Sequence, residues 1–218
     1  RPQREGVFFT TPDPRRALAL LAANWFGHPG REMTLVGVTG TNGKTTTTFL
    51  IKEMLEGALK TRVGLIGTIQ NMVGERVLPA HRTTPESYEV QQLLREMADG
   101  GCTHVVMEVS SHALMQHRVE GLDFAVAAFT NLSQDHLDYH HTMEEYRSAK
   151  ERIFHQCRRA VLNLDDEAGQ WYRGRLACPM FTYSENKDQA DLTAKGIRLY
   201  PGQVEFEAVA REQIQRVF

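Results

Sequence analysis

The chain has 218 residues, with 25 lysines and arginines against 27 aspartates and glutamates and a formal net charge of -2. This balance excludes a general electrostatic attraction to nucleic acid or to a membrane surface, so any anion that binds must be held by a local site. The 3 cysteines are far apart in sequence, which argues against a disulfide framework or a zinc site. We find neither a signal-peptide core nor an apolar run long enough to cross a bilayer, and we therefore expect a cytoplasmic protein without membrane insertion.

Apolar residues at helical spacing predict a first helix at 15–26, which the sequence GHPG ends. We treat residues 1–30 as an entry segment with a linker helix, and residues 31–218 as one larger domain. Within that domain, short apolar strands alternate with helices. The predicted strands are 34–40, 62–68, 103–111, 123–132 and 159–166, and the predicted helices are 45–59, 86–100 and 142–157.

This alternation predicts an α/β fold, with a mostly parallel sheet that helices flank on both faces and with ligands at the carboxyl ends of the strands. The pattern changes near residue 190. From there the apolar residues alternate with a period near two around Pro201 and Gly202, which predicts antiparallel strands added at one edge.

The stretch GVTGTNGKTTTTFL, residues 37–50, predicts a phosphate-binding loop between a strand and a helix. Lys44 would reach the β and γ phosphates, and the hydroxyl of Thr45 would bind magnesium. Thr46 is a further phosphate contact, whereas the next two threonines have the simpler explanation of hydrogen bonds to carbonyls one turn earlier. The strict pattern requires glycine where this chain has Val38, so a glycine-rich turn without a nucleotide stays open as an alternative.

Acidic and histidine side chains follow two further predicted strands. Glu108 stands at the end of one strand, where its carboxylate could share the magnesium of the loop or could be only a capping or solvated group. The segment 131–141 is unusually rich in histidine and aspartate, which are metal ligands. His136, between two aspartates, is the best candidate there, and we expect His140 and His141 to be exposed loop residues.

Two polar segments allow simpler explanations. In the turn at 81–89, Thr84 or Ser87 could only cap the following helix. Ser110 and Ser111 precede a histidine, but no G-x-S-x-G elbow is present, so we reject a serine nucleophile. By default Lys150 would be a solvated helix lysine.

Four separated segments together resemble the central ATP-binding domain of the Mur ligases. The phosphate loop is shared across that superfamily, whereas EVSSHAL combined with NLSQDHLDYH is similar to the members that act on UDP-muramoyl dipeptide. The segments are GVTGTNGKTTT, HRTTPES, EVSSHALMQHRVEGLDF and TNLSQDHLDYHHTMEEYRSAK.

The resemblance implies a set of roles by position. It implies that Lys150 reacts with carbon dioxide and that the carbamate binds a second magnesium together with His136, while Glu108 binds a bridging metal with Thr45. The implied catalytic residues are Lys44, Glu108, His136 and Lys150; the implied ATP-binding residues are Gly40, Thr41, Asn42, Gly43, Lys44, Thr45, Thr46 and Asn131; the residues implied to contact UDP-muramoyl dipeptide are Thr83, Thr84, Ser110, Gln116 and Arg118.

The same resemblance implies an ATP-dependent ligase of peptidoglycan precursor synthesis that adds an amino acid, diaminopimelate or lysine, through an acyl phosphate. Members also have an N-terminal UDP-binding domain and a C-terminal amino-acid-binding domain, so we expect this chain to be a fragment, monomeric and inactive alone. The alternatives are a nucleotide-binding regulatory module, or a related ligase such as folylpolyglutamate synthetase or cyanophycin synthetase, against which TTPES and EVSSHAL argue.

Overall fold

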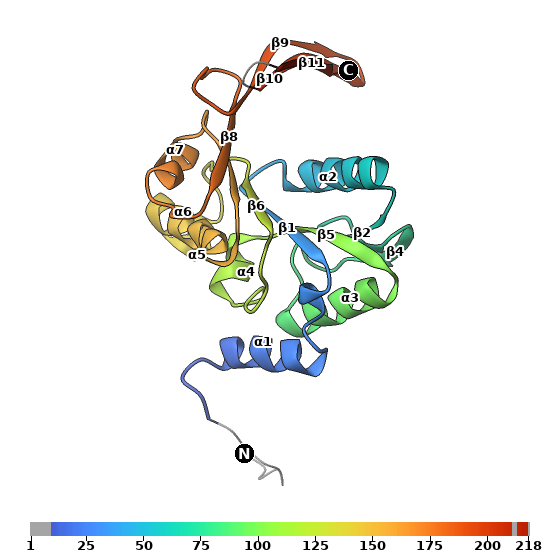
Figure 1. Cartoon of the computed structure of the whole chain (residues 1–218). Coiled ribbons are helices and arrows are strands. Elements are labelled where there is room, and N and C mark those ends of the chain that lie inside the picture. The colour runs from blue at the N-terminus through green and yellow to red at the C-terminus, as the bar shows by residue number, and fades with distance from the viewer. Residues whose placement is uncertain (1–9, 211–212, 218) are drawn as a thin grey trace.

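A computed structural model describes residues 10–210 and 213–217, and its strands form a single sheet with helices on both faces (Figure 1). The predicted entry segment lies partly outside the described residues. The helices are α1 (Pro14–Trp25), η1 (Pro29–Arg31), α2 (Lys44–Leu59), α3 (Ser87–Asp99), α4 (Ser111–Met115), α5 (Leu137–His140), α6 (Met143–Glu151), η2 (Arg152–Gln156) and α7 (Glu167–Arg173). The strands are β1 (Thr34–Thr39), β2 (Arg62–Ile66), β3 (Gln70–Val73), β4 (Arg76–Pro79), β5 (Cys102–Glu108), β6 (Val126–Phe129), β7 (Ala160–Asn163), β8 (Met180–Ser184), β9 (Leu192–Tyr200), β10 (Gln203–Ala210) and β11 (Gln213–Val217).

The strand order is β11-β10-β9-β8-β7-β6-β1-β5-β2-β3-β4. β1 lies in the middle and pairs in parallel with β5 on one side and with β6 on the other. β2, β7 and β8 continue the parallel arrangement outward, so the predicted α/β fold with a mostly parallel sheet is confirmed. The carboxyl ends of β1, β5 and β6 therefore meet at the same edge of the sheet.

Alternate residues of the central strands face two different hydrophobic cores. Val36, Val38 and Leu65 pack beneath α2, together with Phe49 and Leu55 of that helix. On the opposite face, α3, α4, η2 and α7 contribute to the larger core, which contains Leu35, Leu94, Ile153 and Tyr172. Burial on both faces explains why the strands read as continuous apolar runs rather than as an alternating pattern.

The strands that were not predicted from the sequence lie toward the two edges of the sheet. The antiparallel hairpin β3–β4 and the parallel strand β8 were both missed, whereas β9 and β10 pair antiparallel as expected. β9 itself attaches to β8 in parallel. The helix expected at 142–157 is α6 followed by the 3-10 helix η2.

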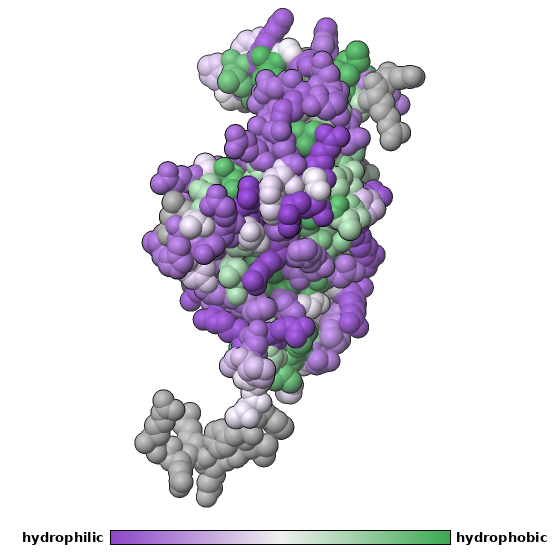
Figure 2. Space-filling model, turned by 90° about the vertical axis from the view of Figure 1, so that its left-hand side faces the viewer, coloured by the Kyte–Doolittle hydropathy of each residue, from purple (hydrophilic) through white to green (hydrophobic). Residues whose placement is uncertain are grey.

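The face of the molecule in Figure 2 is largely hydrophilic. No helix among the described residues has both the length and the apolar character needed to span a bilayer. Apolar side chains are visible on the strand extension at the top of that view. The exposed ones in this extension include Ile197, Leu199, Val204 and Ile214.

Candidate active site

The loop between β1 and α2 has a backbone that only glycine adopts easily. Gly43 has a φ of 80°, and Gly40 has a φ of 144°. A Cβ atom at Gly40 would overlap the hydroxyl of Thr130, which donates a hydrogen bond of 2.7 Å to the carbonyl of Asn42. Gly40 thus allows the loop to lie directly against the end of β6.

The loop is tied to the segment after β6 by the amide side chain of Asn131. The N–H of Asn42 donates to Asn131 Oδ1 at 3.0 Å, and Asn131 Nδ2 donates to the carbonyl of Asn42 at 3.1 Å. The N–H of Thr41 donates to the main-chain carbonyl of Asn131 at 2.8 Å. Asn131, expected to bind nucleotide, therefore braces the loop that would do so.

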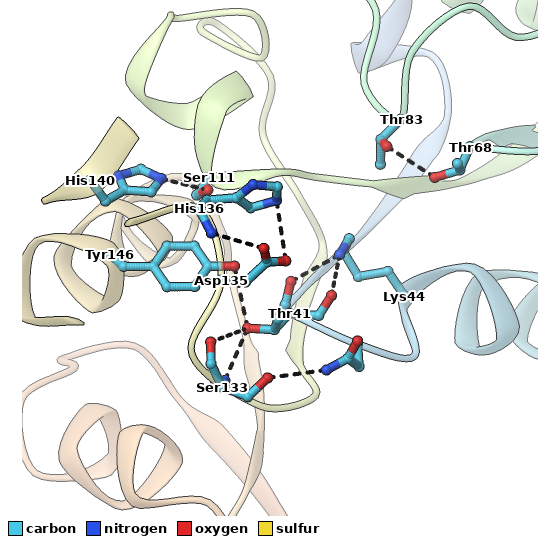
Figure 3. Close-up of polar contacts among 12 residues, drawn as sticks. Thr41, Lys44, Thr68, Thr83, Ser111, Ser133, Asp135, His136, His140 and Tyr146 are labelled. Atoms are coloured by element: carbon cyan, nitrogen blue, oxygen red, sulfur yellow. Dashed lines mark hydrogen bonds and ion pairs between the residues drawn. The ribbon is translucent and has the colours of Figure 1, made fainter. Parts of the chain in front are cut away.

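The same loop leads into the N-terminus of α2. The first N–H groups of a helix have no partner within the helix, and they lie at the positive end of its dipole. Lys44 begins α2 and donates to the carbonyls of Gly40 and Thr41 at 3.0 and 2.8 Å. Burial lowers the pKa of Lys44, although the carboxylates of Glu108 and Asp135 act in the opposite direction. Both carboxylates therefore lie near the lysine, and Figure 3 shows Asp135 together with Lys44.

Glu108 ends β5 and is only 1% exposed, so it is neither a solvated group nor a helix cap. Its carboxylate accepts from the N–H of Thr68 at 2.8 Å and from the hydroxyl of Thr68 at 3.0 Å. A Cβ atom at Gly67 would lie 2.6 Å from Glu108 Oε1, so the carboxylate reaches this loop because Gly67 has no side chain. Sequence reasoning missed Thr68, which ends the predicted strand 62–68 and carries no distinctive motif.

Lys150 of α6 is 1% exposed, and the default expectation of a solvated helix lysine was wrong. Its Nζ donates to the carbonyl of Gly40 at 2.8 Å, the same oxygen that accepts from Lys44. Burial lowers the pKa of Lys150 well below its usual range, and the positive charge of Lys44 adds to this effect. Two lysines thus meet on one carbonyl oxygen of the loop.

The segment 131–141 holds two exposed histidines and a buried one. His136 is exposed, with its Nε2 3.4 Å from Asp135 Oδ2. His140 is buried, so its expected exposure was wrong; its Nε2 lies 2.8 Å from Ser111 Oγ. His141 is exposed as expected. Burial lowers the pKa of His140 to about 4.

The contact between Ser111 and His140 does not make Ser111 a candidate nucleophile. Ser111 is 1% exposed and His140 is 3% exposed, which leaves a substrate carbonyl no access to the hydroxyl. Ser110 caps α4, where its Oγ accepts from the N–H of Ala113 at 3.1 Å.

Thr84 is one of the residues expected to bind substrate, but its hydroxyl is hydrogen-bonded to other parts of the protein. Its hydroxyl donates to the carbonyl of Glu108 at 2.8 Å and accepts from the N–H of Ser110 at 3.1 Å, while Glu86 caps α3. Neither Thr84 nor Ser87 is therefore the helix cap. The hydroxyls of Thr83 and Thr68 lie 3.0 Å apart, close to Glu108.

Arg118 is 8% exposed and already has an anionic partner. It donates to the carbonyl of Thr84 at 2.8 Å and to Gln116 at 2.7 Å, and it forms an ion pair with Glu86 at 2.9 Å. Its Nε is buried without a hydrogen-bond partner among the described residues. Burial lowers the pKa of Arg118, and Glu86 opposes this change. A substrate anion would have to compete with Glu86.

The donor set fits magnesium better than a softer metal. Within the described residues, no group of three or more His, Cys, Asp or Glu side chains is placed to hold a metal ion. Magnesium requires fewer protein ligands, because it uses one or two carboxylates together with phosphate oxygens and water. Glu108, which lies near Lys44 of the phosphate loop, matches that requirement.

Comparison with known proteins identifies the family of the chain. The model of the Mur ligase middle domain matches residues 38–217. The chain belongs to the Mur ligase family. Among curated relatives, the UDP-N-acetylmuramoyl-L-alanyl-D-glutamate--2,6-diaminopimelate ligase of Geobacillus thermodenitrificans (strain NG80-2) is 50% identical over 205 residues, which cover 90% of this chain and 42% of that protein. The ligase of the same name from Geobacillus kaustophilus (strain HTA426) is 49% identical over 203 residues, covering 89% of this chain and 41% of that protein.

A solved structure of a Mur ligase gives the same result in three dimensions. A UDP-N-acetylmuramoyl-L-alanyl-D-glutamate--2,6-diaminopimelate ligase superposes with a TM-score of 0.82 and 30% identity, over 96% of this chain and 44% of that chain. This Mur ligase chain therefore spans about two fifths of the length of the curated relatives that it matches.

Proposed function

We propose that this chain is the nucleotide-binding central part of a ligase that uses ATP and magnesium to join diaminopimelate to UDP-N-acetylmuramoyl-L-alanyl-D-glutamate, in peptidoglycan precursor synthesis. Relatives that are about half identical carry this activity in their names, which favours diaminopimelate over lysine. We also propose a cytoplasmic location and a monomeric state. In the same way, the division at residue 30 into a linker segment and a central domain stays a proposal.

The observation that carries the proposal is the convergence of three chain segments on the phosphate loop. Lys44 and Lys150 both donate to the carbonyl of Gly40, and Glu108 lies close enough to oppose the pKa decrease of Lys44. A regulatory module needs only the loop. A ligase needs a loop, a metal-binding carboxylate and a substrate site together.

In the proposed reaction, a carboxylate oxygen of the dipeptide attacks the γ phosphorus of ATP, and the bond to the ADP oxygen breaks. The amine of the amino acid then attacks the carbonyl carbon of the acyl phosphate and loses a proton, and inorganic phosphate leaves. Bound magnesium would supply positive charge to the transferring phosphoryl group. Thr45 and Glu108 would hold it at the loop, with His136 and carbamylated Lys150 at a second position.

Within this scheme the first N–H groups of α2 bind the phosphate oxygens, and Lys44 exchanges its loop carbonyls for the β and γ phosphates. Carbon dioxide reacts with a neutral amine. The burial of Lys150 and the nearby positive charge of Lys44 favour that form over the ammonium ion.

Titration calorimetry with Mg·ADP and, separately, with UDP-N-acetylmuramoyl-L-alanyl-D-glutamate tests the proposal. We expect the chain to bind both, and Lys44→Met to abolish nucleotide binding while the exposed control Lys195→Met does not. Nucleotide binding that survives Lys44→Met would refute the proposed phosphate site, and binding of the dipeptide would exclude the regulatory module.

The carbamate has a separate test. Carbon NMR in labelled bicarbonate should give one carbamate signal that Lys150→Met removes. A spectrum identical for the two proteins would exclude Lys150 as the modified residue.

A further inference from the structure

Tyr146 links the phosphate loop to the rest of the site, although no motif marks it. Its side chain is 1% exposed, and its hydroxyl lies 3.3 Å from the hydroxyl of Thr41 in the phosphate loop (Figure 3). The two residues are 105 positions apart in sequence. The contact therefore joins α6 directly to the loop after β1.

The other hydrogen bonds of Thr41 determine which of the two hydroxyls donates in this contact. Thr41 Oγ1 accepts from the N–H of Ser133 at 3.1 Å and lies 3.3 Å from the carbonyl of Ser133, to which it can donate its only proton. With that proton used, the remaining acceptor site of Thr41 takes the proton of Tyr146. The tyrosine hydroxyl thus completes the hydrogen bonding of Thr41.

The ring of Tyr146 contacts the other functional segments. Lys150, one helical turn further along α6, places its Nζ 4.5 Å from the ring centroid. The ring of His140 stacks on it with centroids 4.9 Å apart and an angle of 26°, and the ring of His136 meets it edge-on at 6.2 Å. One side chain therefore touches the loop, Lys150 and the histidine segment.

We propose that Tyr146 is a positioning residue that holds the phosphate loop at a fixed distance from Lys150 and from the 131–141 segment. It acts through Thr41 and does not touch the nucleotide. The expectation that loss of the Tyr146 hydroxyl weakens nucleotide binding rests on the proposed function. The expectation that it loosens the phosphate loop does not.

Tyr172 provides a matched control for a tyrosine that only fills the core. It is 0% exposed, and its hydroxyl donates to the carbonyl of Arg147 at 2.7 Å, which anchors the same helix α6 from its other side. Tyr146→Phe and Tyr172→Phe each delete one buried hydroxyl and keep the ring. Both substitutions should lower the stability of the protein to a similar extent. A difference between the two variants in the behaviour of the phosphate loop is therefore evidence that Tyr146 positions the loop.

Hydrogen exchange in the nucleotide-free chain tests the loop itself. The amides of Thr41 and Asn42 both donate to Asn131, and we expect them to exchange several-fold faster in Tyr146→Phe but not in Tyr172→Phe. Equal exchange in the two variants would overturn the proposal, whether or not the chain binds nucleotide.

Calorimetry with Mg·ADP tests the functional consequence. Loss of one hydrogen bond corresponds to about fivefold weaker binding in Tyr146→Phe, with Tyr172→Phe unchanged. Thr41→Val should weaken binding without adding to the effect of Tyr146→Phe, and Thr41→Ser should restore it. Additive effects of Tyr146→Phe and Thr41→Val would show that the two hydroxyls do not act through each other. If the unaltered chain bound no Mg·ADP, the proposed function would fail, and hydrogen exchange would still decide the position of the loop.

Discussion

Gly40→Ala should disrupt the phosphate loop through two separable effects. An alanine at a φ of 144° is strained by about 1–3 kcal/mol. The added Cβ also overlaps Thr130 Oγ1 and displaces its hydrogen bond of 2.7 Å to the carbonyl of Asn42, which costs about 1 kcal/mol more. We therefore expect the free energy of unfolding to fall by about 2–4 kcal/mol, which lowers the urea midpoint by about 1 M or more.

Urea unfolding and Mg·ADP calorimetry of three variants separate the two effects. Thr130→Ala alone should lose only the hydrogen bond. In Gly40→Ala combined with Thr130→Ala the hydrogen bond is lost only once, so its stability should match that of Gly40→Ala instead of falling by the sum of the two single effects. Nucleotide affinity should fall at least tenfold in Gly40→Ala. A Gly40→Ala protein with unchanged stability and affinity would refute the close approach of the loop to β6.

Three further changes follow from contacts described above. Gly169→Ala should lower the free energy of unfolding by several kcal/mol in chemical unfolding, because its Cβ would overlap a backbone carbonyl of β7. Gly174→Ala, whose Cβ would have its nearest atom at 3.7 Å, should cost at most about 1 kcal/mol. Similar losses of stability in the two variants would contradict this packing of α7 on β7. The pKa of His140 is about 4 when folded and 6.5 in the unfolded chain, so its contribution of roughly 3 kcal/mol to the free energy of unfolding is present above pH 6.5 and is lost as the pH falls toward 4. The free energy of unfolding, measured at several pH values, should therefore depend less on pH in His140→Gln than in the unaltered chain. The same pH dependence in both proteins would refute the assignment. Glu86→Gln removes the carboxylate that pairs with Arg118 and should tighten binding of UDP-N-acetylmuramoyl-L-alanyl-D-glutamate in calorimetry, and weaker binding would show that Glu86 orients the arginine instead of competing with the substrate.

Local signals in the sequence were sufficient for the central strands and their helices. The apolar run of β1, the glycines after it and the helical pattern of α2 each act within a few residues, and the structure places all of them as expected. The hairpin β3–β4 has no such signal, because Val77 is 55% exposed and the only marker is the turn glycine Gly74, with a φ of 60°.

The site was less predictable because burial there depends on contacts between distant segments. Lys150 and His140 have the composition of surface residues, and they are buried only because α6 and α5 pack against the loops after β1 and β5. Tyr146 lies four residues before Lys150, so helical spacing could have placed both on one face. The identity of their common partner, the loop at Gly40, required the sheet order.

The central position of β1 has a consequence for how the protein acquires its binding loop. β1 pairs with residues 104–108 on one side and with residues 126–129 on the other, and the brace at Asn131 follows directly after the second pairing. During synthesis the loop at 40–43 is therefore made long before the residues that shape it. Nucleotide binding by a nascent chain would consequently mark the moment when β6 docks beside β1, and it would report assembly of the central strands rather than of the first strand and helix.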